Sequence, residues 1–166
     1  MSKAIEMKKQ VVDEIVDKFE RSSAAIVIDY RGLKVEEATE LRKRFREAGV
    51  DYKVYKNTLV KRAAEKAGAS ELVESLNGPN AIAFGYDDPV APARIASEYA
   101  KDHEDLELKV GVVEGTFYDE GSLKKLANIP SREVLIAKLL GSLKAPISNF
   151  AYLAKAIADK KQEEEA

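Results

Sequence analysis

The chain has 166 residues, of which 45% are hydrophobic and 34% are charged, and its formal net charge is -2. A chain of this length can form one domain with a full hydrophobic core, but it is too short for two domains of typical size. The absence of cysteine excludes disulfides, thiolate metal sites and cysteine nucleophiles, and it fits a reducing compartment.

Neither end of the chain indicates export or membrane insertion. The N-terminus lacks the apolar stretch of a secretory signal, and no apolar run approaches the roughly 20 residues that span a bilayer. We therefore expect a cytoplasmic protein without a membrane partner.

The first part of the chain alternates predicted helices with short predicted strands. Apolar residues recur at helical spacing over about 4–20 and about 35–48, and Gly49 is a typical helix stop. The run 24–28 is apolar throughout, as in a buried strand, whereas 50–55 alternates apolar and polar residues, as in a half-buried strand.

The pattern then becomes helical towards the C-terminus. Asn57 is a candidate cap for a helix over 59–67, and Asp88-Pro89 is typical of a helix start. Further elements are expected in this order: a short helix at 71–76, a strand at 81–84, a helix at about 89–101, the last strand at 106–113, and helices at about 122–127, 131–143 and 147–161.

The fold class is therefore α+β. We expect a compact N-terminal domain over residues 1–130, in which helices pack a small mixed sheet, followed by a C-terminal helical extension over 131–166. The strand order stays open. The strands are too few and too short for a doubly wound nucleotide-binding sheet.

Charge is distributed unevenly along the chain. Residues 31–66 hold 11 Lys/Arg against 6 Asp/Glu, a net charge of +5, whereas residues 67–131 hold 5 against 12, a net charge of -7. Such asymmetry suggests a face for a polyanion. Two ordinary solvated surfaces are the alternative.

No pattern of catalytic residues is present, and we expect neither an enzyme nor a bound cofactor. Glycine-rich phosphate loops and a nucleophile elbow are missing. The lone histidine, His103, lies in the polar stretch Asp102-His103-Glu104-Asp105. Such a residue is far more often part of a solvated loop than a metal ligand.

The basic segment suits phosphate recognition. Lys53, Lys56, Lys61 and Arg62 surround the predicted turn before Asn57, and Tyr52 and Tyr55 are close to them in sequence. Cations on loops, beside an exposed helix N-terminus, favour phosphate oxygens, and folded RNA offers these together with unstacked bases. Simple solvation of the surface is the other interpretation.

The last predicted helix carries an apolar stripe. Its apolar residues follow one another at spacings of three and four, and charged residues lie off the stripe. A helix of about 15 residues is marginal alone in water, so the stripe needs a cover. The chain's own domain and a groove in another protein are both possible covers.

Several motifs resemble one known family, the large-subunit ribosomal protein conventionally numbered ten, which anchors the lateral stalk. The resemblance covers the whole chain. Its most specific segments are Asp29-Tyr30-Arg31-Gly32-Leu33, Thr39-Glu40-Leu41-Arg42-Lys43, Lys56-Asn57-Thr58-Leu59 with Arg62-Ala63, Gly78-Pro79-Asn80-Ala81, Pro130-Ser131-Arg132-Glu133, and Lys144-Ala145-Pro146-Ile147.

The resemblance implies an N-terminal domain that binds ribosomal RNA beside ribosomal protein eleven. It also implies a terminal helix that carries dimers of the acidic seven/twelve stalk protein, which recruit translational GTPases. The short spine suggests two dimers, and repression of the protein's own messenger is a further possibility. A regulatory or assembly-factor relative that binds the same RNA without a stalk is the alternative, although such a relative is expected to lack the apolar helix.

The resemblance also implies site residues. Tyr30 and Gly32 are expected to shape a turn. The RNA candidates are Arg31, Lys53, Lys56, Asn57, Lys61 and Arg62, with Lys8 and Lys9 as additions. The stalk-protein candidates are Ile147, Phe150, Leu153, Ala154 and Ile157, with Ala151 and Ala158 allowing close approach.

Overall fold

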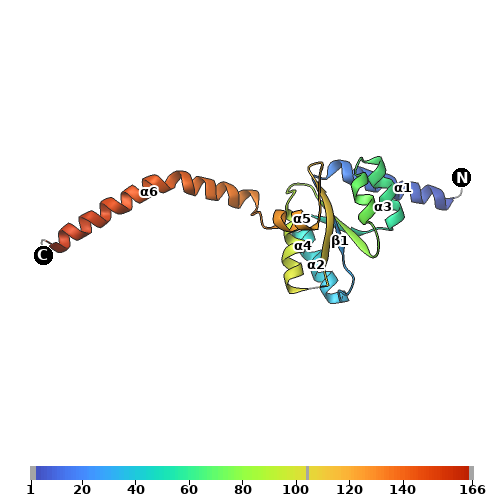
Figure 1. Ribbon diagram of the computed structural model, residues 1–166, viewed down its shortest axis with the longest axis horizontal. Helices are drawn as coiled ribbons and strands as arrows, with labels where there is room; N and C mark the ends of the chain where they lie inside the picture. The colour runs from blue at the N-terminus through green and yellow to red at the C-terminus, as the bar shows by residue number, and fades with distance from the viewer. Residues whose placement is uncertain (1–2, 104, 165–166) are drawn as a thin grey trace. The chain divides into compact units, whose positions relative to one another are not determined.

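A computed structural model describes residues 3–103 and 105–164 (Figure 1). The chain divides into two units, Met1–Ile129 and Pro130–Ala166. The elements of the first unit are α1 (Lys3–Arg21), β1 (Ala24–Asp29), α2 (Val35–Glu47), β2 (Asp51–Val54), α3 (Asn57–Lys66), the 3-10 helix η1 (Ser70–Ser75), β3 (Asn80–Gly85), α4 (Ala91–Asp102), β4 (Glu107–Val113), β5 (Thr116–Tyr118) and α5 (Glu120–Ala127).

The first unit is built on a five-stranded sheet in the order β2-β3-β1-β4-β5. The expected α+β class is confirmed. All four strand pairings are antiparallel, in place of the mixed pairing expected from the sequence. The central strand β1 pairs with β3 so that Asp29 lies opposite Asn80, which places the end of β1 beside the start of β3.

Helices cover both faces of the sheet (Figure 1). Because side chains alternate along a strand, Ile26 and Ile28 join one core cluster, with side chains from α2, α4 and α5. Ala25 and Val27 join the other cluster, with side chains from α1, α3 and η1. The central strand is therefore buried on both faces, as its uniformly apolar sequence predicts.

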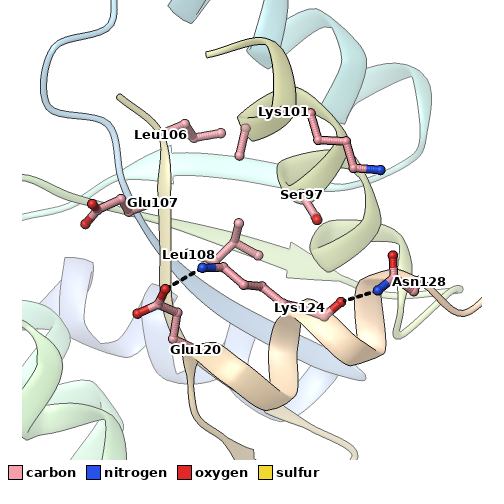
Figure 2. A pocket seen from close by; sticks show the side chains of 9 residues that line it. Ser97, Lys101, Leu106, Glu107, Leu108, Glu120, Lys124 and Asn128 are labelled. Carbon is pink, nitrogen blue, oxygen red and sulfur yellow. Dashed lines mark hydrogen bonds and ion pairs between the residues drawn. The ribbon is translucent and has the colours of Figure 1, made fainter. Parts of the chain in front are cut away.

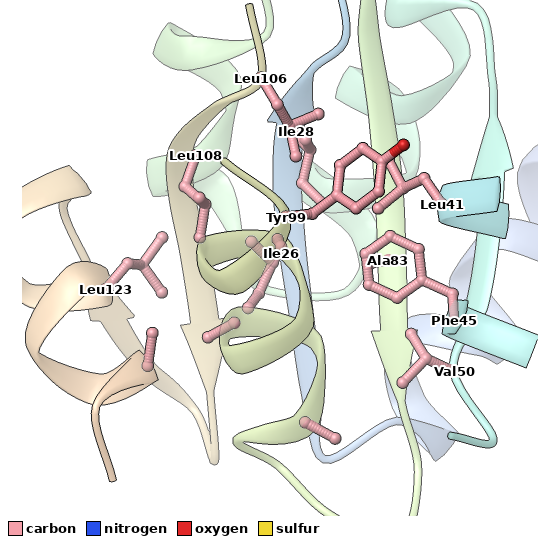
Figure 3. Close-up of a cluster of buried hydrophobic side chains, with 14 residues drawn as sticks. Ile26, Ile28, Leu41, Phe45, Val50, Ala83, Tyr99, Leu106, Leu108 and Leu123 are labelled. Atoms are coloured by element: carbon pink, nitrogen blue, oxygen red, sulfur yellow. The ribbon is translucent and has the colours of Figure 1, made fainter. Parts of the chain in front are cut away.

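Tyr99 is the largest fully buried side chain of the first cluster (Figure 3). Its hydroxyl donates a hydrogen bond of 2.9 Å to the backbone carbonyl of Glu37. The ring of Phe45, in the same cluster, stacks on Tyr52 of β2 with 5.0 Å between the ring centroids. The cluster thus ties α4 to α2 and α2 to the edge strand.

The hairpin β4–β5 corrects the expectation that 106–113 is the last strand. Glu114 and Gly115 form its tight turn, and both have positive φ, 49° and 75°. Such turns match the twist of paired strands but usually carry Asn or Asp before the glycine. The glutamate at that position explains why the sequence pattern missed the hairpin.

The second unit contains one long helix, α6 (Arg132–Glu164), in place of the two helices expected at 131–143 and 147–161. Pro146 lies inside it. Proline lacks an N–H group and clashes with the carbonyl four residues earlier, so it kinks a helix without always ending it. The arms Arg132–Pro146 and Ser148–Ile157 are bent by 46°.

Within the described residues, no single helix is long and apolar enough to cross a membrane, although the two bent arms of α6 pass that test as a pair by length and composition.

Candidate nucleic-acid interface and partner-binding helix

The turn Asn77-Gly78-Pro79-Asn80 joins η1 to β3 and brings several predicted RNA residues together. The side-chain amide of Asn57 donates a hydrogen bond of 2.8 Å to the carbonyl of Gly78. The ammonium of Lys61 lies 3.5 Å from Oδ1 of Asn77. The N-terminal half of α3 is therefore fastened to this turn, which we call the Asn77–Asn80 turn.

Arg31 reaches the same turn from the end of β1. Its backbone N–H donates to Oδ1 of Asp29 at 3.0 Å. A Cβ atom added to Gly78 would lie 3.4 Å from Nη2 of Arg31, so the guanidinium lies beside the glycine. Arg31 and Asn57, 26 positions apart in the chain, thus both adjoin Gly78.

Lys109 of β4 lies beneath the turn, and the sequence analysis did not single it out. Its ammonium is 2.9 Å from Oδ2 of Asp29, 2.7 Å from the carbonyl of Asn77 and 2.9 Å from Oδ1 of Asn80. Asn80, at 4% exposure, is a buried polar residue of the described chain. Lys109 belongs to segment 67–131, whose net charge is negative. A search for basic segments therefore did not point to it.

The local electrostatics keep Asp29 ionised. Burial raises the pKa of Asp29, but hydrogen bonds from Lys109 and from the backbone of Arg31 outweigh that effect and lower the pKa below its ordinary value. The carboxylate therefore neutralises part of the positive charge under the turn, while Arg31 stays exposed at its rim.

Lys56, and not Asn57, is the N-cap residue of α3. Asn57 is the first residue of the helix, and its side chain binds Gly78 instead of capping. No side chain forms a cap hydrogen bond at Lys56. The ammonium of this exposed lysine therefore lies at the N-terminus of α3, where the helix dipole is positive and favours anions.

Lys53 faces a different environment. Its ammonium lies 3.0 Å from Oε1 of Glu14 and 5.1 Å from the centre of the Tyr55 ring. The hydrogen bond with Glu14 raises the pKa of Lys53. Its charge is thus partly neutralised within the protein.

The remaining predicted cations form a separate group. Lys8 and Lys9 of α1, with Arg62 of α3, line a hollow of about 560 Å³ together with Val12, Glu65 and Lys66. The eight RNA candidates therefore lie in three places: the Asn77–Asn80 turn with the adjoining α3 N-terminus, the hollow between α1 and α3, and the Glu14 contact.

His103 does not lie in a fully solvated loop. It is half-buried at the end of α4, where its ring stacks on Tyr99 at 4.2 Å between centroids. Its Nδ1 lies 3.9 Å from Oε1 of Glu37. Among residues 3–103 and 105–164, no group of three His, Cys, Asp or Glu side chains is arranged to hold a metal ion.

A second hollow, of about 480 Å³, lies between α4, β4 and α5 (Figure 2). Leu106 and Leu108 form its apolar part. At its rim, the ammonium of Lys124 lies 2.6 Å from Oε1 of Glu120, and Asn128 donates to the carbonyl of Lys124 at 3.0 Å. Glu120 and Lys124 are thus paired with each other.

The helix α6 exposes large apolar side chains along both arms. Phe150 is 75% exposed, and Leu153, Ile157 and Ala151 are exposed as well. The side chains of the other predicted contacts, Ile147, Ala154 and Ala158, lie outside the described residues. The first arm adds exposed apolar residues that the predicted site did not include: Leu135, Ile136, Leu139, Leu140 and Leu143.

The two arms continue one stripe. With about 100° of rotation per residue, Leu139, Leu143, Phe150, Leu153 and Ile157 fall on one side of the helix. Tyr152, 74% exposed, falls on the opposite side. An exposed stripe of this length is typical of a surface that another protein covers.

The first unit carries basic residues around the Asn77–Asn80 turn, and α6 exposes an apolar stripe. These two features together are typical of a structural protein that assembles with other macromolecules. The family described as ribosomal protein L10 matches residues 3–101, and the ribosomal protein uL10 C-terminal region matches residues 129–166. The chain belongs to this family. It is therefore a structural constituent of the large ribosomal subunit in the bacterial cytoplasm, and not an enzyme.

Curated relatives agree over the full length. The chain is 69% identical to the large ribosomal subunit protein uL10 of Alkaliphilus metalliredigens, over 100% of both chains. It is 66% identical to that of Clostridioides difficile, over 99% of both chains, and 57% identical to that of Bacillus cereus, over 100% of both chains.

Proposed function

We propose that the first unit binds large-subunit ribosomal RNA through the Asn77–Asn80 turn and the adjoining N-terminus of α3. The observation that carries this proposal is the convergence of Arg31, Asn57 and Lys61 on one turn. Arginine and lysine on a rigid turn, beside a helix N-terminus with no side-chain cap, suit a phosphate backbone. Lys56 lies at that helix end, and Lys8, Lys9 and Arg62 offer a second contact area.

The RNA proposal is tested by salt-dependent binding. Three or four phosphate contacts give a slope of about -2 to -4 in log affinity against log salt, at roughly -0.7 to -0.9 per phosphate. Filter binding of the full chain to the large-subunit RNA of the stalk base measures this slope. An interaction that is independent of salt contradicts the proposal.

We also propose that α6 carries dimers of the acidic seven/twelve stalk protein, and that these recruit translational GTPases. The exposed stripe supports this role, because Leu135 to Ile157 covers about 33 Å of helix at 1.5 Å per residue. Pro146 divides the stripe into two arms. One dimer on each arm would give two dimers in all. The measured mass of a co-purified complex tests the stoichiometry.

Two further roles follow from the family resemblance and belong to the same proposal. The RNA-binding unit lies beside ribosomal protein eleven on the ribosome, and it represses translation when it binds its own messenger. Competition between the messenger leader and the ribosomal RNA fragment tests the second role, because one shared surface requires mutual displacement. A relative that binds RNA without a stalk is expected to lack an apolar terminal helix. The presence of α6 is therefore an argument against this alternative.

A further inference from the structure

The basic residues of α2 differ from one another in their surroundings. Arg44 lies 2.6 Å from Glu40, and Lys43 lies 3.9 Å from Glu47, one helical turn away in each case. Arg42 and Arg46 are also exposed and one turn apart, but neither forms an ion pair with a carboxylate of residues 3–103 or 105–164. The two arginines therefore present positive charge outward.

These two arginines line a hollow of about 350 Å³ at the end of α2. Its other walls are Gly49, Val50, Asp51 and Tyr52. The carboxylate of Asp51 lies 2.5 Å from the ammonium of Lys18, so its charge is already paired. The hollow is consequently positive and suited to an anion.

Tyr52 gives the hollow a fixed polar group. Its ring stacks on Phe45 with an angle of 9° between the ring planes, which holds the side chain in place. Burial raises the pKa of Tyr52 to about 12. The phenol thus keeps its proton at neutral pH and can donate a hydrogen bond to an anionic oxygen.

The hollow lies on the face of the sheet that α2 covers, level with the first half of β1, because Asp51 pairs with Phe84 and Phe84 pairs with Ala25. Arg42 and Tyr30 both lie near enough to the phenol of Tyr52 to affect its pKa. Tyr30 directly precedes Arg31, whose guanidinium lies beside Gly78 of the Asn77–Asn80 turn. The turn itself lies at the other end of β1, where Asp29 pairs with Asn80, so the hollow and the turn are two separate places on the first unit.

We propose that the Arg42–Arg46 hollow is a second binding site for the ribosomal RNA, which receives a backbone phosphate between the two guanidinium groups. Residues one helical turn apart are neighbours on a helix surface, and guanidinium groups bind phosphate oxygens with two parallel hydrogen bonds. Two adjacent guanidinium groups on the unit that carries the proposed RNA surface favour the same RNA as the bound anion. This inference rests on the proposed RNA-binding function.

The test replaces both arginines in the full chain, as Arg42→Ala with Arg46→Ala, and measures affinity for the stalk-base RNA at several salt concentrations. Loss of one phosphate contact is expected to make the salt slope shallower by about 0.7–0.9. Affinity is expected to fall on the order of tenfold, as loss of a charge-assisted contact predicts. Arg42→Lys with Arg46→Lys keeps the charges, and is expected to restore the slope with only part of the affinity.

The matched control is Lys43→Ala with Lys124→Ala, which removes two cations that are also exposed but have carboxylate partners. Equal loss of affinity in the two double variants overturns the proposal, because it assigns the effect to net charge. Unchanged RNA binding with impaired entry into large subunits also overturns it, and assigns the hollow to a protein partner. If the unaltered chain fails to bind the RNA with a salt dependence, the proposed function itself fails.

Discussion

Lys109 and Asp29 form an ion pair of 2.9 Å between neighbouring strands, and the same ammonium donates a hydrogen bond of 2.7 Å to the carbonyl of Asn77. The two side chains are 24% and 14% exposed. One partly buried pair thus joins β1 and β4 to the turn at which the proposed RNA contacts meet.

Replacement of Lys109 by Met is expected to destabilise the first unit by about 1–3 kcal/mol. The change leaves the carboxylate of Asp29 partly buried without its lysine partner, and it removes the donor to Oδ1 of Asn80. Urea unfolding measures the change. Lys124→Met is the matched control, since its pair with Glu120 is exposed and is worth at most about 1 kcal/mol. Equal losses in both variants contradict a special role for Lys109.

The stability of the first unit is expected to fall as the solution is acidified below the ordinary carboxyl value of 3.8. Burial opposes ionisation of Asp29, but Lys109 and Arg31 lower its pKa in the folded state. A group with a lowered folded pKa stabilises the protein above its unfolded pKa, and this contribution is lost as the pH falls through the folded pKa. In Asp29→Asn, the urea midpoint of unfolding should fall less steeply at acidic pH than in the unaltered chain. An unchanged pH dependence would contradict the role given to Asp29.

Gly78→Ala is expected to weaken RNA binding as well as stability. Gly78 has φ +82°, and the added Cβ would lie 3.4 Å from Nη2 of Arg31. Gly49→Ala is a close control, because its φ is +70° and nothing lies within 4 Å of the added atom. Both variants should lose about 1–2 kcal/mol through backbone strain, whereas only Gly78→Ala should lose RNA affinity.

Arg31 and Lys53 are expected to contribute unequally to RNA binding. Arg31→Met should make the salt slope shallower by about 0.7–0.9, as loss of one phosphate contact does. Lys53→Met should have a smaller effect, because Glu14 already lies 3.0 Å from its ammonium. Filter binding across a salt series compares them, and a larger effect for Lys53 would contradict this ranking.

Each arm of α6 is expected to hold one stalk-protein dimer. Leu139→Asp with Leu143→Asp, or Phe150→Asp with Leu153→Asp, should each reduce the complex from two dimers to one, because a charge on the stripe opposes apolar burial. Light scattering of the purified complex gives the mass. Tyr152→Ser, on the opposite side of the helix, should leave two dimers bound, and loss of both dimers in either double variant contradicts separate sites.

Much of the fold was predictable because local signals agreed with it. The apolar run of β1 and the spacing of α2 indicated these elements, and Gly49 ended α2 as expected, with φ +70°. The hairpin at Glu114 was missed because its turn lacks the usual residues. The two C-terminal helices were predicted separately because Pro146 is normally a strong stop signal, which the bend in α6 accommodates.

The candidate site was predictable in composition but not in arrangement. Arg31, Asn57 and Lys61 were named from the sequence, yet they meet only because the antiparallel register places the end of β1 beside the start of β3. Lys109 lies 80 positions after Asp29, in a segment of opposite net charge. No local pattern reveals such a pair.

The bend at Pro146 also has a consequence for how this chain can vary. Proline interrupts the backbone hydrogen bonds of α6. Each arm is therefore stabilised by burial of its own apolar residues, and not by cooperative hydrogen bonding along the whole helix. Whole turns can therefore be inserted into or deleted from the distal arm without a change in the first unit. If α6 carries stalk-protein dimers as proposed, mutation can change their number through the length of this helix, independently of the rest of the molecule.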